Sequence, residues 1–339
     1  MADFAQVYRS YVGVGVQGAA LTTSVAATAF QSIDACSVRE NSPGRKLIKG
    51  IRKNQDMNLA LRGSRDVSGS ISGPLVPDEM FDGILWALLL GNNNAASGSS
   101  GAGYTHTFSQ ARPATVADYP AYGATLEALI GGTDTTLMRD FVGSFVKSVT
   151  ISGQKDGEVK VSVEIMGVKE VTGGTVSTPT YSTKLPFEAY MADIKLGSVI
   201  GSVSSVECKS FTIKIDNGLK MVPGLNGRYA IGRTYGPITT SFEFEMDLRE
   251  DLTVYNYWKN DTTMAAQLVL THDQLAGSSS GVYSLKIDFP TVIFDGDVPN
   301  IEGEAEIPHK VSMKPFYDSV TGKTLSVVVV NSQSGTYSV

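Results

Sequence analysis

The clearest pattern in the chain is an alternation of hydrophobic and polar residues, which is typical of β-strands that bury one face. It is sharpest in residues 206–216, where Phe211, Ile213 and Ile215 alternate with polar residues, and it returns in residues 238–246. The chain is therefore predicted to be mainly β. Further strands are predicted at residues 33–39, 56–62, 66–72, 104–109, 121–130, 145–152, 158–166, 266–271, 284–289, 305–313 and 325–330.

A helical period interrupts the strands after residue 76. Pro77 suits a first helical turn, Asp78 and Glu79 favour the positive end of a helix, and Gly91 offers a left-handed stop. We predict a compact amphipathic helix that closes a core and is far too short to cross a bilayer. Its core-facing residues are Met80, Phe81, Ile84, Leu85, Leu88 and Leu89. A second short helix is predicted at residues 247–260, with Leu252, Tyr255 and Trp258 on one face.

The rare residues indicate an internal duplication. The two tryptophans are 172 positions apart (258 − 86 = 172), and so are the two cysteines (208 − 36 = 172). Each half has the order strand, long loop, strand, helix, Gly/Ser-rich loop and further strands, so two similar β domains are predicted. Trp86 and Trp258 are the expected helix anchors of the two domains. The predicted divisions are an N-terminal arm at residues 1–30, domains at residues 31–170 and 201–339, and a joint at residues 171–200.

Composition narrows the classes of protein. The 339 residues carry a net charge of −6, so generic affinity for nucleic acid or acidic membranes is not expected. Two cysteines do not form a disulfide framework, and a reducing compartment is the simpler interpretation. Residues 11–30 lack the basic start and unbroken apolar run of a signal peptide.

No catalytic, cofactor or metal site is predicted, and the protein is not expected to be an enzyme. Residues 13–18 match the GxGxxG pattern, but no βαβ unit follows, so they are interpreted as a glycine-rich arm. His106, His272 and His309 lack the spacing of metal ligands. Cys36 and Cys208 have no adjacent base in the sequence and are expected to be small buried core residues.

A basic loop is the strongest local charge feature. Five cations fall within nine residues, without the interleaved aromatic residues that stack on bases. Both a solvated loop and a contact with an acidic surface of another subunit remain open. The cations are Arg45, Lys46, Lys49, Arg52 and Lys53.

Several stretches resemble the tail tube (major tail) proteins of long-tailed bacteriophages. In the first half these are residues 62–64 (Arg-Gly-Ser), 68–73 (Ser-Gly-Ser-Ile-Ser-Gly) and 85–91 (Leu-Trp-Ala-Leu-Leu-Leu-Gly). Residues 210–217 and 232–246 resemble the second half of such proteins, and the likeness in pattern and order extends over most of the chain.

The resemblance implies tandem β-sandwich or barrel domains, each with a flanking helix and a long loop. It also implies edge-to-edge joining into stacked rings, whose lumen conducts the genome and the tape-measure protein. A two-domain chain is expected to form a trimeric ring with pseudo-sixfold symmetry. Expected partners are other copies of the chain, the tail terminator and the distal tail proteins, with assembly in the host cytoplasm and no membrane insertion.

On this interpretation, the basic loop of Arg45, Lys46, Lys49, Arg52 and Lys53 is a candidate contact between rings. The acidic alternation of Glu243, Glu245 and Asp247 is a candidate lumen surface, where like charge would keep DNA from adhering. The main alternative is a two-domain β-sandwich adhesin or decoration protein that binds a ligand and does not polymerise.

Overall fold

The structure is a computed structural model of the chain. It describes residues 10–18, 22–42, 46–48, 59–61, 63–91, 96–109, 123–131, 138–174, 176–225, 227–247, 256–257, 259–295 and 308–337.

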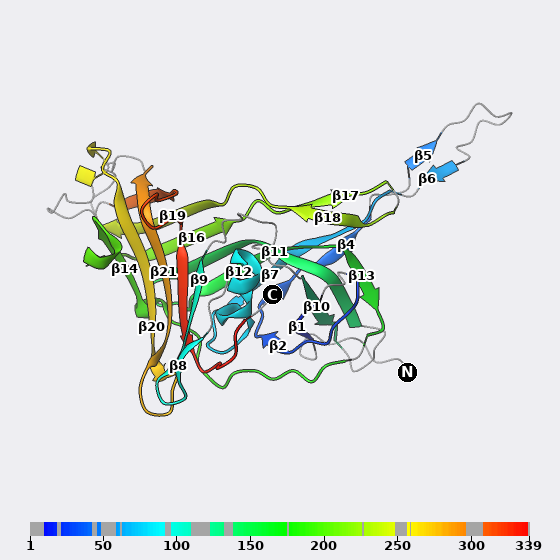
Figure 1. Ribbon diagram of the computed structural model, residues 1–339, viewed down its shortest axis with the longest axis horizontal. Coiled ribbons are helices and arrows are strands. Elements are labelled where there is room, and N and C mark those ends of the chain that lie inside the picture. Colours follow the sequence, from blue (N-terminus) through cyan, green and yellow to red (C-terminus); the bar gives the residue numbers. More distant parts are fainter. Residues whose placement is uncertain are drawn as a thin grey trace.

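A six-stranded antiparallel sheet joins the two halves, and we call it the central sheet (Figure 1). Its long strand β11 (Met138–Gln154) belongs to the first half and pairs directly with β16 (Ser210–Asp216) of the second half. The sheet is therefore continuous across the two halves of the chain. Its order is β7 (Asp66–Pro74), β12 (Lys160–Gly167), β11, β16, β19 (Thr239–Asp247) and β22 (Pro308–Pro315).

Further strands gather at the two ends of the central sheet (Figure 1). At the first-half end lie β1 (Tyr11–Val16), β2 (Ala29–Gln31), β10 (Ala124–Leu129) and β13 (Lys169–Thr172). At the second-half end lie β14 (Ala192–Gly197), β15 (Val203–Val206), β20 (Met264–Leu275), β21 (Val282–Phe294) and β23 (Ser326–Asn331), with the 3-10 turns η5 (Ala189–Met191) and η6 (Ile200–Ser202). Strand β23 also pairs with β9 (Gly103–Ser109), which pairs with β8 (Ser97–Ser99), so the last strand of the chain returns to the first half.

Two hairpins extend away from the body (Figure 1). The first, β5 (Lys46–Ile48) with β6 (Leu59–Leu61), lies farthest out, and the second is β17 (Lys220–Pro223) with β18 (Ala230–Thr234). They meet where Arg228 donates from Nε to the Gly63 carbonyl at 3.1 Å and accepts from the Arg65 amide at 2.5 Å. The second hairpin thus supports the base of the first.

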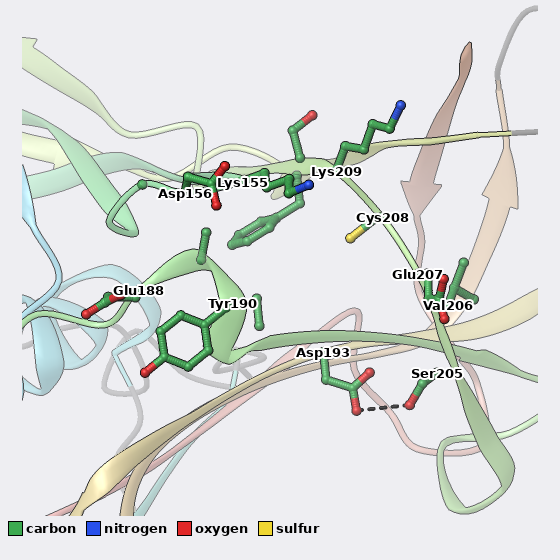
Figure 2. Close-up of a pocket in the computed structure, with 16 residues that line it drawn as sticks. Lys155, Asp156, Glu188, Tyr190, Asp193, Ser205, Val206, Glu207, Cys208 and Lys209 are labelled. Carbon is green, nitrogen blue, oxygen red and sulfur yellow. Dashed lines mark hydrogen bonds between the residues drawn. The ribbon is translucent and has the colours of Figure 1, made fainter. Parts of the chain in front are cut away.

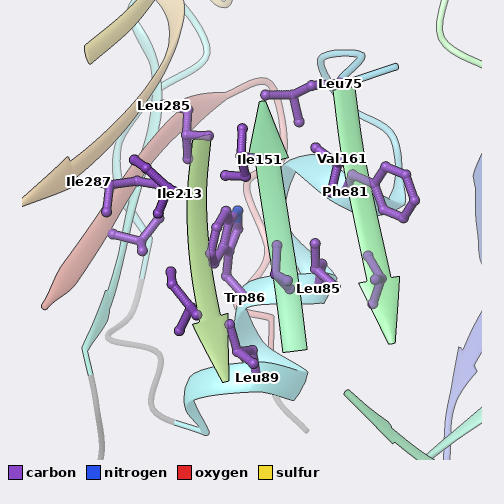
Figure 3. Close-up of a cluster of buried hydrophobic side chains, with 14 of the residues drawn as sticks. Leu75, Phe81, Leu85, Trp86, Leu89, Ile151, Val161, Ile213, Leu285 and Ile287 are labelled. Carbon is purple, nitrogen blue, oxygen red and sulfur yellow. The ribbon is translucent and has the colours of Figure 1, made fainter. Parts of the chain in front are cut away.

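The helix α1 (Ile84–Leu90) fills the centre of the hydrophobic core. All seven of its residues are buried, and Trp86 is 0% exposed. Figure 3 shows the Trp86 ring lying against the central sheet between Ile151 and Ile213. The helix ends as predicted at Gly91, which has φ of 77° and donates its amide hydrogen to the Ala87 carbonyl.

Two details of the predicted helix are wrong. It does not begin near Pro77, because Asp78 has φ of 63°, and the chain passes through the 3-10 turn η2 (Met80–Asp82) before α1 starts. Nor is the helix amphipathic, since sheet strands and loops cover it on every side. The turn at Asp78 is held by partners distant in sequence, the Tyr283 hydroxyl at 2.5 Å and the Ser332 amide at 3.0 Å.

The N-terminal glycine-rich segment is also more ordered than predicted. Strand β1 is not an irregular arm or an edge, because it lies between β10 and β2. Its glycines allow a close crossing of the chain, since a Cβ on Gly15 would lie 2.3 Å from the Ala26 carbonyl oxygen. The GxGxxG pattern therefore reflects packing within a sheet.

The strand pairings of the first half recur in the second. This repetition supports an internal duplication, which stays a prediction. The corresponding pairs are β1–β2 and β14–β15, β1–β10 and β14–β20, β5–β6 and β17–β18, β7–β12 and β19–β22, β10–β11 and β20–β21, β11–β12 and β21–β22, and β11–β13 and β21–β23. Asn256, Tyr257 and Lys259 are helical at the site of the second predicted helix, whereas Trp258 lies outside the described residues.

The burial of Trp86 gives a first prediction. Trp86→Ala should lower the apparent free energy of unfolding by about 3–5 kcal/mol, because it opens a cavity between α1 and the central sheet. Trp86→Phe should cost clearly less, since the indole Nε1 is buried without a hydrogen-bond partner among the described residues. Urea unfolding followed by circular dichroism measures both. Leu225→Ala, at a fully exposed position, is the control, and equal unfolding of Trp86→Ala and this control would contradict the role of the helix.

Candidate assembly surfaces

One sheet edge beside β7 is open. The short strands β3 (Ala35–Cys36) and β4 (Arg39–Asn41) pair with β7 through Cys36↔Ile71 and Arg39↔Ser68. In the part of the chain that the structure describes, no strand pairs with their other edge. Open edges present unpaired backbone groups and pair readily with another strand.

A groove of about 470 Å³ lies beside this edge, and we call it the Cys36 groove. Residues 33–39 form one wall, and β1, β10 and β11 form the others. Cys36 is exposed in it, so the prediction of a buried core cysteine is wrong. The sequence could not reveal this, because the alternation of the strand does not show whether a neighbouring strand covers it.

A second groove, of about 750 Å³, surrounds Cys208 (Figure 2). Cys208 is half-buried, so it too is not a core residue, and burial raises the pKa of its thiol to about 11. Residues 205–211 form one wall, and the turn of the β11–β12 hairpin, residues 153–157, lies beside them in the lining. The Lys155 amide donates to the Lys209 carbonyl at 3.0 Å, which continues the β11–β16 pairing at the rim of the groove.

The outer face of the central sheet is covered mainly by hydroxyl groups. The pairing registers align side chains in rows that run across the strands. Eleven of the twenty positions are serine or threonine, and the charged ones are four acids and three lysines. The rows are Ser70, Glu164, Ser148, Asp216, Thr239; Ser72, Ser162, Thr150, Lys214, Ser241; Pro74, Lys160, Ser152, Thr212, Glu243, Ser312; and Gln154, Ser210, Glu245, Lys310.

The predicted acidic residues lie on β19 of this face. Glu243 is half-buried and pairs with Lys310 at 2.8 Å, and Glu245 is exposed. Asp247 ends the strand opposite Pro308. The sequence analysis missed the serines and threonines that surround them, although their period-two spacing was a usable signal.

Of the predicted basic loop, the structure describes Lys46, which begins β5 opposite Leu61 of β6. Arg45, Lys49, Arg52 and Lys53 lie outside the described residues.

Buried carboxylates elsewhere are bound within the fold. Asp82 accepts from the Asp78 amide at 3.0 Å and from Asn331 Nδ2 at 3.3 Å, and burial raises its pKa to about 7. Glu127 accepts from the Tyr11 hydroxyl, the Ala27 amide and Ser177. These groups hold loops against sheets and face no open cleft.

The three histidines are buried on separate strands. His106 contacts the Gln333 carbonyl at 2.9 Å and His272 the Leu185 carbonyl at 3.0 Å, and burial lowers the pKa of His106 and of His309. Across the described residues, no three histidine, cysteine, aspartate or glutamate side chains are placed to hold a metal ion. Within the same residues, no helix is long and apolar enough to span a membrane.

The described residues form a mainly β protein with a sheet edge that lacks a partner strand and with two projecting hairpins. The family model described as phage tail tube protein matches residues 10–314, which are 305 of the 339 residues (314 − 10 + 1 = 305). The chain therefore belongs to the phage tail tube protein family, which is a structural family of the virion tail whose members assemble into tubes. A search of curated proteins finds no match.

The buried position of Asp82 gives a pH-dependent prediction. Because its pKa is raised from 3.8 to about 7, the fold favours the neutral carboxyl, and this stabilisation is full below pH about 4 and lost as the pH rises through about 7. Asp82→Asn, which stays neutral, should raise the Tm at pH 8 by at least about 2 °C and leave it unchanged at pH 4. Scanning calorimetry at the two pH values measures this. Glu245→Gln controls for the loss of an acidic charge, and an equal effect of Asp82→Asn at both pH values would argue against the ionisation of Asp82.

Proposed function

We propose that the protein polymerises into stacked rings that form the tail tube, a conduit for delivery of the genome into the host. Family membership supports the tube, and the open edge at β3 and β4 supports ring formation by strand pairing. The observation that carries the proposal is the β11–β16 pairing, which already joins two similarly connected halves into one sheet.

The recurring strand pairings support a trimeric ring with pseudo-sixfold symmetry. If each half occupies one of six similar positions, three chains complete the circle. The tandem domains at residues 31–170 and 201–339, with residues 1–30 before the first and the joint at residues 171–200 between them, are part of this proposal. Head-to-tail contacts of this kind close into a ring when the rotation per copy divides the circle.

The outer face of the central sheet is the proposed wall of the lumen. Its rows mix hydroxyl groups with three lysines and four acids, among them Glu243 and Glu245, and Asp247 ends the same strand. Such a surface would let DNA and the tape-measure protein pass without adhering, because its acids outnumber its lysines and Glu243 pairs with Lys310.

The further partners are the tail terminator and the distal tail proteins, which would cap the two ends of the tube. Assembly is proposed to take place in the host cytoplasm. The rival function, a two-domain adhesin or decoration protein, predicts dispersed monomers and an exposed aromatic patch. Electron microscopy of the purified protein separates the two: rings or tubes are expected, and monomers at every concentration would refute the proposal.

The basic loop is proposed to contact the next ring. Reversing the charge of Arg45, Lys46, Lys49, Arg52 and Lys53 together should leave rings intact and reduce their stacking into tubes, because an attractive contact becomes repulsive. Tube length in electron micrographs is the measurement. The control reverses Lys259 and Lys323, outside the loop, and tubes of unchanged length in the five-residue variant would remove the loop from the contact.

The lumen assignment predicts a gain of DNA binding. Replacing Glu243, Glu245 and Asp247 by lysine should leave tubes intact but make them bind double-stranded DNA at low salt, with binding that weakens as salt is raised. Co-sedimentation of tubes with DNA measures the effect. Asp273→Lys, on β20 and outside the central sheet, is the control, and equal binding by wild-type and variant tubes would place the three acids away from the DNA path.

A further inference from the structure

Equivalent strands of the two halves have different surroundings. In the second half β16 pairs with β19, and in the first half β3 and β4 pair with β7. Strand β16 therefore corresponds to β3 and β4. The other edge of β16 is covered by β11 of the first half over seven residue pairs, from Ser148↔Asp216 to Gln154↔Ser210. The corresponding edge of β3 and β4 has no partner strand among the described residues.

The two grooves reproduce this difference. Residues 205–211 line the Cys208 groove and residues 33–39 line the Cys36 groove, and both ends of the segment are offset by 172 positions (205 − 33 = 172; 211 − 39 = 172). The lining of the Cys208 groove includes a hairpin turn from the other half, residues 153–157, whose Lys155 amide bonds to the Lys209 carbonyl. All the residues that line the Cys36 groove belong to the first half. The Cys208 groove is thus lined by both halves of the chain, whereas the Cys36 groove is lined by one.

The second half offers a matching edge. Strand β21 pairs with β20, β22 and β23 in the same arrangement in which β11 pairs with β10, β12 and β13. Strand β11 pairs with β10 first and, farther along the same edge, with β16. Strand β21 pairs with β20 as far as Val292, and on that edge Ile293 and Phe294 have no partner strand among the described residues. Ile293 is 41% exposed there, an apolar side chain on an open edge.

We propose that the open edge at β3 and β4, with the Cys36 groove, receives the β21 edge at Ile293 and Phe294 of a second copy of this chain. The contact would place the second half of one copy beside the first half of the next, as the β11–β16 pairing places the two halves side by side within one chain. It rests on the proposed function and specifies which two edges meet in the ring. Internal and intermolecular pairings then alternate around the circle, and each uses mainly backbone hydrogen bonds.

The native thiols provide the test, because they occupy matching places in the two grooves. In Cys208→Ser, Cys36 is the one remaining cysteine, and its rate of labelling by a bulky maleimide is compared in unassembled protein and in tubes. We expect labelling to be slower in tubes by about tenfold or more, since the second copy covers the groove. Protein labelled at Cys36 before assembly should also fail to form rings, and labelling after folding leaves the fold itself intact.

Cys36→Ser is the matched control. Its Cys208 thiol lies at the internal version of the contact, so its labelling rate should be the same before and after assembly. Tubes in which Cys36 reacts as fast as in unassembled protein would overturn the assignment of this edge and leave the proposed function standing. Labelled protein that still forms rings would overturn it as well. Protein that forms no rings under any condition would overturn both.

Discussion

The pairing of β11 with β16 is the interaction on which the rest of the structure depends. It pairs the backbone groups at the edge of a strand from each half, and it joins two sets of strands into one central sheet. Unpaired backbone groups at a sheet edge are costly when buried and prone to unintended pairing when exposed. The chain covers one such edge internally, and the equivalent edge has no partner strand among the described residues, which suits the proposed continuation of the sheet into another copy. On this proposal, the same kind of backbone pairing would serve the fold of one protomer and the assembly of many.

The core supports this arrangement from one face of the sheet and leaves the other face polar. The helix α1 is apolar on all sides because strands, loops and the C-terminal segment enclose it, and Trp86 fixes its distance from Ile151 and Ile213 (Figure 3). The C-terminal segment contributes through Asn331 and Ser332, whose contacts reach Asp82 and Asp78 in the first half. These contacts hold the C-terminal segment against the first half, so the two halves are connected by hydrogen bonds as well as by the shared sheet. The hydroxyl-covered face of the sheet is then free for the proposed lumen.

Family membership and the surfaces of the chain agree on a structural role. Polar groups that would suggest catalysis in isolation, such as Asp82 and Glu127, anchor loops, and partners such as Asn331 of Asp82 and Ala27 of Glu127 lie far away in the sequence. The projecting hairpins differ from the sheet edges in kind. They place side chains beyond the body of the protomer, whereas the edges offer backbone groups. This division suits a tube in which contacts around a ring and contacts between rings are made by separate parts.

The sequence by itself determined the mainly β class, most strand positions and the helix at residues 84–90, because period-two and helical patterns record which side chains face a core. The repeat of rare residues also predicted the order in which strands recur. Only the tertiary structure decided what covers each strand. Cys36 and Cys208 occupy matching places in the sequence, yet the strand of Cys36 has a free edge among the described residues, whereas the segment of Cys208 is bonded to a hairpin from the other half. The all-round burial of α1, the turn at Asp78 and the crossing at Gly15 likewise depend on segments far away in the chain. Local patterning reports that a face is buried, but the identity of its partner is a long-range property that only the folded chain specifies.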